Sequence, residues 1–268
     1  MQQLTYIVSG TADAQRKAEQ AKEKLDRIPH VESLLITIAA PCEMAAEKAG
    51  SMVNAVRELF PHARILAHTC ALKMADLSLD TEGAMLTFTA FESSRVEFVT
   101  VEGNTPASEA KESIARFVGA RPHTKAVEFF VVGLMDQLGA LLEGCTVMDE
   151  HIAVFGAFVD SPPMGVHGYL IADDAELRFG MAAIVFHGET LDAHAVRNFG
   201  WNELGREIVA TRVDGCTIKE LDGGIPLRIY ERYFGIKGNG DFSSDAALFP
   251  LCFEEEDGSV SARVPLKI

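Results

Sequence analysis

The 268 residues include 24 Lys and Arg against 39 Asp and Glu, and the net charge of −15 argues against nucleic acid or anionic membrane as a partner. A hydrophobic fraction of 48% and a charged fraction of 24% are typical of a soluble globular protein. The five cysteines form no C-x-x-C pair, and the amino terminus has neither a basic segment nor a long apolar run. We therefore expect a cytoplasmic protein in a reducing compartment, without a signal peptide or a membrane span.

The first part of the chain is predicted to alternate strands and helices. Strands are predicted at 4–8, 31–39 and 63–69. Between them, apolar residues at helical spacing predict one helix capped by Thr11 and a second that ends before Pro61. This β-α-β-α-β order favours parallel strands joined by helical crossovers.

The pattern then shifts towards strands. The segments 85–91 and 95–101 alternate in polarity and predict a hairpin. A helix after Pro106, a buried strand at 126–132 and a helix at 133–143 follow. From residue 152 onward strands dominate, until a helix begins at Pro226. The predicted fold class is α/β: a layered sheet core with a parallel βαβ first half, a mostly antiparallel β-rich second half and helices outside.

Two strand ends carry small residues that leave room for a ligand. Thr69-Cys70 ends the strand at 63–69, and Gly156-Ala157 lies in FGAFVD, which we interpret as part of a buried strand. Open α/β sheets bind ligands beyond the carboxyl ends of their strands, so both places are expected to open on one crevice. At Gly156, a sheet bend packed against its neighbour is the alternative interpretation.

Charge narrows the choice of ligand. In a protein with a net charge of −15, an anionic group needs a local cation, and Arg178 is the best-placed candidate in the β-rich part. An amino acid would suit a site in which Arg178 binds the carboxylate and Asp160 binds the ammonium group. We therefore place amino-acid-like ligands before haem.

Two other kinds of chemistry stay open at this point. Cys70 shares a strand face with His68 and could act as an activated nucleophile. The histidines show no zinc-binding spacing, so no metal site is expected. A haem needs only one axial histidine, for which His68, His151, His167 and His187 are all candidates.

Three segments carry a resemblance to a known family. The run GWNELGREIVATRVDGCTIKELDGGIPLRIYERYFG resembles the signature of FIST domains, in which a GW start, a strand, an ELDG turn and a helix with Tyr follow in this order. FPHARILAHTC and VFGAFVD resemble two further family segments, with Cys70 near the family's cysteine. Ala67 and Ala157 stand where that family usually has glycine. The resemblance covers residues 30–235.

The resemblance implies a sensory domain at 1–235 and the beginning of a truncated or divergent C-terminal portion at 236–268. It implies a small-molecule ligand, a signalling output protein or domain as partner, and no catalysis. We therefore expect a non-catalytic sensor without a cofactor, and an oligomer is compatible with the sequence. A haem-based nitric oxide sensor and an enzyme that uses Cys70 are the alternatives. The expected ligand-binding residues are Thr69, Cys70, Gly156, Ala157, Asp160 and Arg178.

Overall fold

The computed structural model divides the chain into two compact units. The larger comprises Met1–Pro162 and Val166–Ala195, and the smaller comprises Pro163–Gly165 and Val196–Ile268. The structure describes residues 1–70, 73–75, 78–80, 82–133, 151–159, 168–196, 200–215, 217–238, 242–254, 258 and 260–265. None of the helices in these ranges is both long and apolar enough to cross a membrane.

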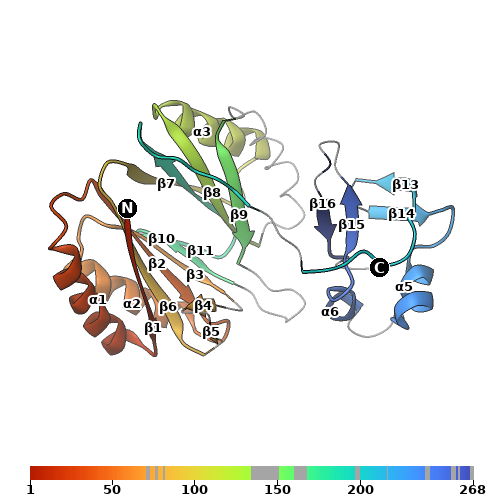
Figure 1. Cartoon of the computed structure of the whole chain (residues 1–268), viewed down its shortest axis with the longest axis horizontal. Coiled ribbons are helices and arrows are strands. Elements are labelled where there is room, and N and C mark those ends of the chain that lie inside the picture. Colours follow the sequence, from red (N-terminus) through yellow and green to blue (C-terminus); the bar gives the residue numbers. More distant parts are fainter. Residues whose placement is uncertain are drawn as a thin grey trace. The chain divides into compact units, whose positions relative to one another are not determined.

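The larger unit is built on two β-sheets (Figure 1). In strand order, the six-stranded sheet contains β1 (Gln2–Val8), β6 (Ala84–Phe91), β2 (Ser33–Ala40), β3 (Arg64–Thr69), β10 (Leu170–Ala172) and β11 (Ala175–Leu177). The four-stranded sheet contains β7 (Arg95–Glu102), β12 (Gly180–His187), β8 (Thr124–Val132) and β9 (Ala153–Phe158). A separate short pair consists of β4 (Lys73–Ala75) and β5 (Ser78–Asp80).

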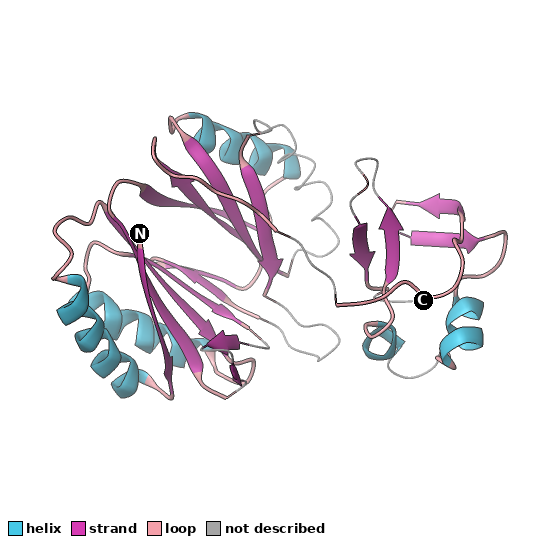
Figure 2. Ribbon diagram, viewed as in Figure 1, coloured by secondary structure: helices cyan, strands magenta, loops and turns pink. Residues whose placement is uncertain are grey.

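Helices cover the outer faces of both sheets, as Figure 2 shows. Helices α1 (Thr11–Leu25) and α2 (Ala46–Leu59) bury an alanine-rich stripe on the six-stranded sheet, and α3 (Ala107–Gly119) packs on the four-stranded sheet. A third core lies between the sheets and includes Leu66, Phe130 and Ile184. The result is a layered α/β/β/α arrangement, which confirms the predicted α/β class with helices outside.

The two sheets repeat one topology. In the orders β1-β6-β2-β3 and β7-β12-β8-β9, the second strand pairs antiparallel with both neighbours and the last two strands are parallel. The helix between the first and third strand of each order also recurs, as α1 and α3. The carboxyl ends of β2 and β3 in one sheet therefore correspond to those of β8 and β9 in the other.

Two expectations about the strands were wrong. The segments 85–91 and 95–101 form no hairpin, because β1 and β2 occupy both edges of β6 and β7 pairs with β12 in the other sheet. Strand β9 is not buried, because it is the edge strand of its sheet and its Phe155 and Phe158 are exposed.

One expectation about the strands is confirmed: β2 and β3 are parallel neighbours, as the crossover pattern predicts. Thr11 is the first residue of α1 and makes no side-chain cap bond. The predicted helix at 133–143 lies outside the described residues except for Gly133.

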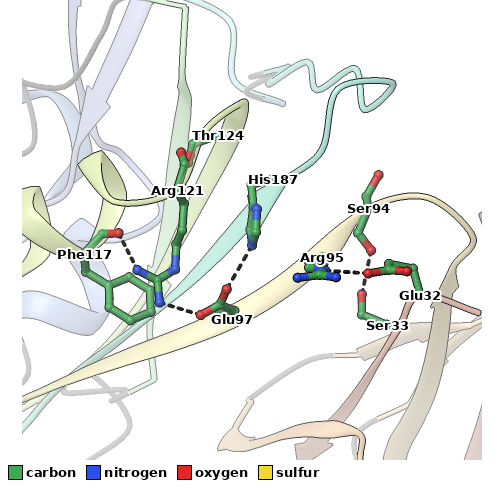
Figure 3. A network of polar contacts seen from close by, with 9 residues as sticks. All are labelled: Glu32, Ser33, Ser94, Arg95, Glu97, Phe117, Arg121, Thr124 and His187. Carbon is green, nitrogen blue, oxygen red and sulfur yellow. Dashed lines mark hydrogen bonds and ion pairs between the residues drawn. The ribbon is translucent and has the colours of Figure 1, made fainter.

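Ion pairs fix the point where the chain passes from one sheet to the other (Figure 3). The Ser33 hydroxyl donates a hydrogen bond to the Ser94 carbonyl at 2.8 Å, and Arg95 pairs with Glu32 at 2.5 Å. Farther along β7, the Glu97 carboxylate accepts a bond from Arg121 at 2.5 Å and lies 3.1 Å from His187 Nε2. The contacts of Glu97 hold the connection between α3 and β8, and the end of β12, against β7.

Among the described residues, the core cluster of the smaller unit contains four buried apolar residues: Tyr230, Ile236, Phe242 and Ala246. Its elements are β13 (Ala210–Asp214), β14 (Thr217–Leu221), α5 (Leu227–Phe234), α6 (Phe242–Ala246), β15 (Leu251–Glu254) and β16 (Val260–Arg263). Pro226 precedes α5 and Gly235, with φ of 70°, ends it, as turn chemistry predicts. This core contains residues on both sides of residue 235. The boundary between the larger and the smaller unit lies between Ala195 and Val196.

We expect Gly156→Ala to destabilise the larger unit. A Cβ at Gly156 would lie 2.1 Å from the Phe129 carbonyl oxygen of β8, so the strand pair must separate. The free energy of unfolding should fall by about 1–3 kcal/mol in urea denaturation. The control is Gly119→Ala in α3, where a Cβ has open space and should raise helix stability by up to about 1 kcal/mol. Equal effects of the two changes would contradict the strand contact.

We expect Glu97→Gln to reduce stability in a pH-dependent way. Burial opposes ionisation of Glu97, but Arg121 and then His187 outweigh it and hold the pKa of this carboxyl below its ordinary value. Its stabilisation is present above the unfolded pKa of about 4.3 and is lost as the pH falls through the folded value. The variant should therefore lose about 1–2 kcal/mol at neutral pH and little in acid.

The matched control for this change is Glu112→Gln, on the exposed face of α3. Glu112 lies 4.0 Å from Arg116, and both side chains are mostly in solvent. Removal of the Glu112 charge should therefore leave the free energy of unfolding, measured by urea denaturation, unchanged. A stability difference between wild type and Glu97→Gln that stays constant with pH would contradict the role given to the Glu97 charge.

Candidate functional site

The carboxyl ends of β2 and β3 are joined to the start of β10. The Thr69 hydroxyl accepts a hydrogen bond from the Tyr169 amide at 2.9 Å, and the Thr69 amide donates to the Tyr169 carbonyl at 3.2 Å. The Cys70 amide donates to the Ala40 carbonyl of β2 at 2.7 Å. Thr69 and Tyr169 are buried, while Cys70 and Cys42, which lies two residues after the end of β2, are partly accessible.

The carboxyl ends of β8 and β9, in the four-stranded sheet, lie close to Gly168 and Arg178. A Cβ added to Gly168, next to Tyr169, would lie 2.5 Å from the Val159 carbonyl that follows β9. A Cβ added to Gly133, at the end of β8, would lie 3.1 Å from the Arg178 carbonyl. Only residues without side chains allow backbones to approach so closely. The strand ends of both sheets therefore converge around Tyr169 and Arg178.

Arg178 supplies positive charge at this junction. It lies in the turn between β11 and β12. Its guanidinium lies 5.5 Å from the centre of the Tyr169 ring and pairs with Glu176 at 3.0 Å. The side chain is 53% exposed, so its remaining donors can reach a ligand.

The Tyr169 hydroxyl is the unusual group of the site. The residue is 3% exposed, and the buried oxygen has no hydrogen-bond partner among the described residues. Burial raises the pKa of Tyr169 to about 12; Arg178 opposes this rise, and Cys42 and Glu176 add to it. An unsatisfied buried hydroxyl costs about 1–3 kcal/mol, and such a group in a folded protein calls for a ligand or water.

A cavity of about 240 Å³ opens beside Arg178. It is lined by Glu102, Gly103, Asn104, Glu176, Leu177, Arg178 and Phe179. The Phe179 ring lies directly over Gly103 and Gly133, where a Cβ would come within 2.1 Å and 2.8 Å of it. The two glycines thus set the position of an aromatic wall next to a cation and two carboxylates.

The structure brings together only some of the expected ligand-binding residues. Thr69, Cys70 and Arg178 all lie around Tyr169. Gly156 and Ala157 lie in the edge strand β9, and the bare face of Gly156 is filled by the Phe129 backbone of β8, as the alternative interpretation holds. Asp160 lies outside the described residues.

Four residues of the site were not identified from the sequence: Cys42, Tyr169, Glu176 and Phe179. Glu176 could have been found, because it lies two residues before Arg178 and alternate residues of a strand share a face. Nothing in the sequence places Tyr169 next to Thr69, since the two are 100 residues apart.

Two of the candidate haem ligands, His68 and His187, contact other side chains in the structure. The His68 ring packs against Phe130 between the sheets, with 4.7 Å between ring centres, and His187 lies against Glu97. Burial lowers the pKa of His68, partly offset by its contact with the Thr69 carbonyl. His151 is exposed before β9, and His167 lies outside the described residues. The described part of the chain also holds no group of three or more His, Cys, Asp or Glu residues arranged for a metal ion.

We expect Tyr169→Phe to leave the unliganded protein as stable as wild type, or to stabilise it by about 1–3 kcal/mol, because it removes an unsatisfied buried hydroxyl. The matched control is Tyr230→Phe, whose hydroxyl donates to the Phe249 carbonyl at 2.9 Å and whose loss should cost about 0.5–1.5 kcal/mol. Thermal and urea denaturation measure both. Destabilisation by Tyr169→Phe would mean that the hydroxyl has a partner.

The model of the FIST N domain family matches residues 34–224, which is more than half of the chain. This range includes every residue of the site described above. No curated protein matches the chain. FIST domains are sensory domains of signal-transduction proteins and are not known as a catalytic family. The chain belongs to the FIST N domain family.

Proposed function

We propose that this chain is a non-catalytic sensing domain that binds a small zwitterion such as an amino acid beside Arg178. The observation that carries the proposal is a cavity that offers charges of both signs. Its Arg178 guanidinium lies 5.5 Å from the ring centre of Tyr169, whose buried hydroxyl has no hydrogen-bond partner among the described residues. In this proposal Glu176 takes the role that the sequence analysis gave to Asp160, because the Glu176 carboxylate pairs with Arg178.

The chemistry of the cavity suits a ligand of this class. Arg178 can bind a carboxylate through the donors that Glu176 leaves free, and Glu102 or Glu176 can accept bonds from an ammonium group. Phe179 provides an apolar surface for a side chain. About 240 Å³ admits a metabolite of amino-acid size and is too small for a haem.

A cavity in the smaller unit is the competing place. It measures about 430 Å³ and includes Lys237 and Asp245 on its rim, between α5 and α6. The hydroxyl of Tyr230, a buried residue of α5, already donates a hydrogen bond to the Phe249 carbonyl. The family match ends at residue 224, before this cavity begins. We therefore favour the site at Arg178.

The experiment is a thermal-shift screen of amino acids and related metabolites with the full chain. A ligand at a hundred times its dissociation constant stabilises the folded state by about 2.7 kcal/mol, which raises the melting temperature. Arg178→Gln should remove the shift, because it removes the only cation that lines the cavity of about 240 Å³. Lys237→Gln should retain it, as the matched loss of a cation at the other cavity.

Three results would contradict the proposal. A shift lost in Lys237→Gln and kept in Arg178→Gln would move the ligand to the smaller unit. Absorbance near the Soret band in the purified protein would favour the haem alternative. A Cys70 thiol that titrates far below about 8.5 would favour the cysteine-dependent enzyme.

A further inference from the structure

Exposed apolar side chains are concentrated in the smaller unit. Twelve of the eighteen large apolar residues that are exposed in the described part of the chain lie between 196 and 268, among them Leu204, Val209, Val213 and Leu248. The core cluster of this unit contains four buried residues among those described. Exposed apolar side chains that gather on a surface mark an interaction site.

In the smaller unit, strand β13 has one edge without a partner strand among the described residues. Its other edge pairs with β14. An edge strand offers a row of backbone donors and acceptors to another strand. Strand addition of this type is a common mode of recognition.

Charge favours a second copy at this unit. Residues 196–268 contain nine Lys and Arg and twelve Asp and Glu, a net charge of −3, while the whole chain carries −15. The remaining −12 lies on the larger unit, which repels its own copy. Two smaller units can approach each other with little repulsion.

The sequence of β13 is complementary to itself. It reads Arg212-Val213-Asp214 around an exposed valine, with Arg212 and Asp214 mostly in solvent. In an antiparallel pair centred on Val213, Arg212 stands opposite the partner's Asp214, and Asp214 stands opposite the partner's Arg212. Opposite charges directly across two strands are stabilising, and such a pairing closes with two-fold symmetry.

We propose that two copies of this chain associate through the free edge of β13, antiparallel about a two-fold axis at Val213. The two valines then cover each other on one face, while two Arg–Asp pairs form on the other. The association is independent of the ligand site at Arg178, which lies in the larger unit.

Sedimentation velocity of the full chain over a broad range of concentrations tests the pairing. Wild type should form a dimer, while Arg212→Asp and Asp214→Arg should each weaken it by placing like charges opposite each other. The double change Arg212→Asp with Asp214→Arg should restore it. Arg116→Asp on α3, an exposed site in the larger unit, is the control for net charge and should leave the dimer intact.

A cysteine pair provides a second test, because Arg212 also pairs with Glu220 and its loss could disturb the hairpin. Val213→Cys should form a disulfide between two copies on mild oxidation, since directly opposed residues lie about 4.5–5.5 Å apart. Val209→Cys, also exposed, should give only the background of the native cysteines, because the two copies of this residue lie more than about 20 Å apart.

The outcomes separate clearly. A dimer restored by the double change and a disulfide specific to Val213→Cys support the proposal. A monomer at all concentrations overturns it. A dimer in which Val209→Cys links as well as Val213→Cys also overturns it, because the contact then lies elsewhere.

Discussion

The site depends on one backbone pairing, that of β10 with β3. Leu170, Ile171 and Ala172 pair antiparallel with His68, Ala67 and Leu66, although β10 belongs to the part of the chain that builds the other sheet. This pairing brings Tyr169 to Thr69 and carries Arg178 to the junction of the two sheets.

The repeated topology explains why the strand ends can converge. Each sheet ends its parallel strand pair at the same kind of edge, β2 with β3 and β8 with β9. The chain between β9 and β12 crosses to the first sheet as β10 and β11 and returns. Ligand crevices form where connections leave such an edge in different directions. The repeated topology, together with the passage of the chain into the first sheet as β10 and β11, therefore defines the position of the candidate site.

The close contacts at this junction rely on residues that lack a side chain. Gly168 admits the Val159 backbone, and Gly133 admits the Phe179 ring and the Arg178 backbone. The Tyr169 hydroxyl is meanwhile buried without a partner. A buried polar group without a partner among the described residues, in otherwise close packing, is the observation on which the proposed ligand site rests.

The sequence by itself determined the α/β class, the helices α1, α2, α3 and α5 and the strand end at Thr69-Cys70, because local periodicity and turn residues are properties of neighbouring residues. It did not determine the partners of β6 and β7, since alternation shows which face is buried but not which strand lies alongside. Tyr169 beside Thr69, and Gly156 against Phe129, were decided only by the tertiary structure. Both are contacts between distant segments, and pairing over such separations depends on the packing of the whole sheet rather than on any local pattern.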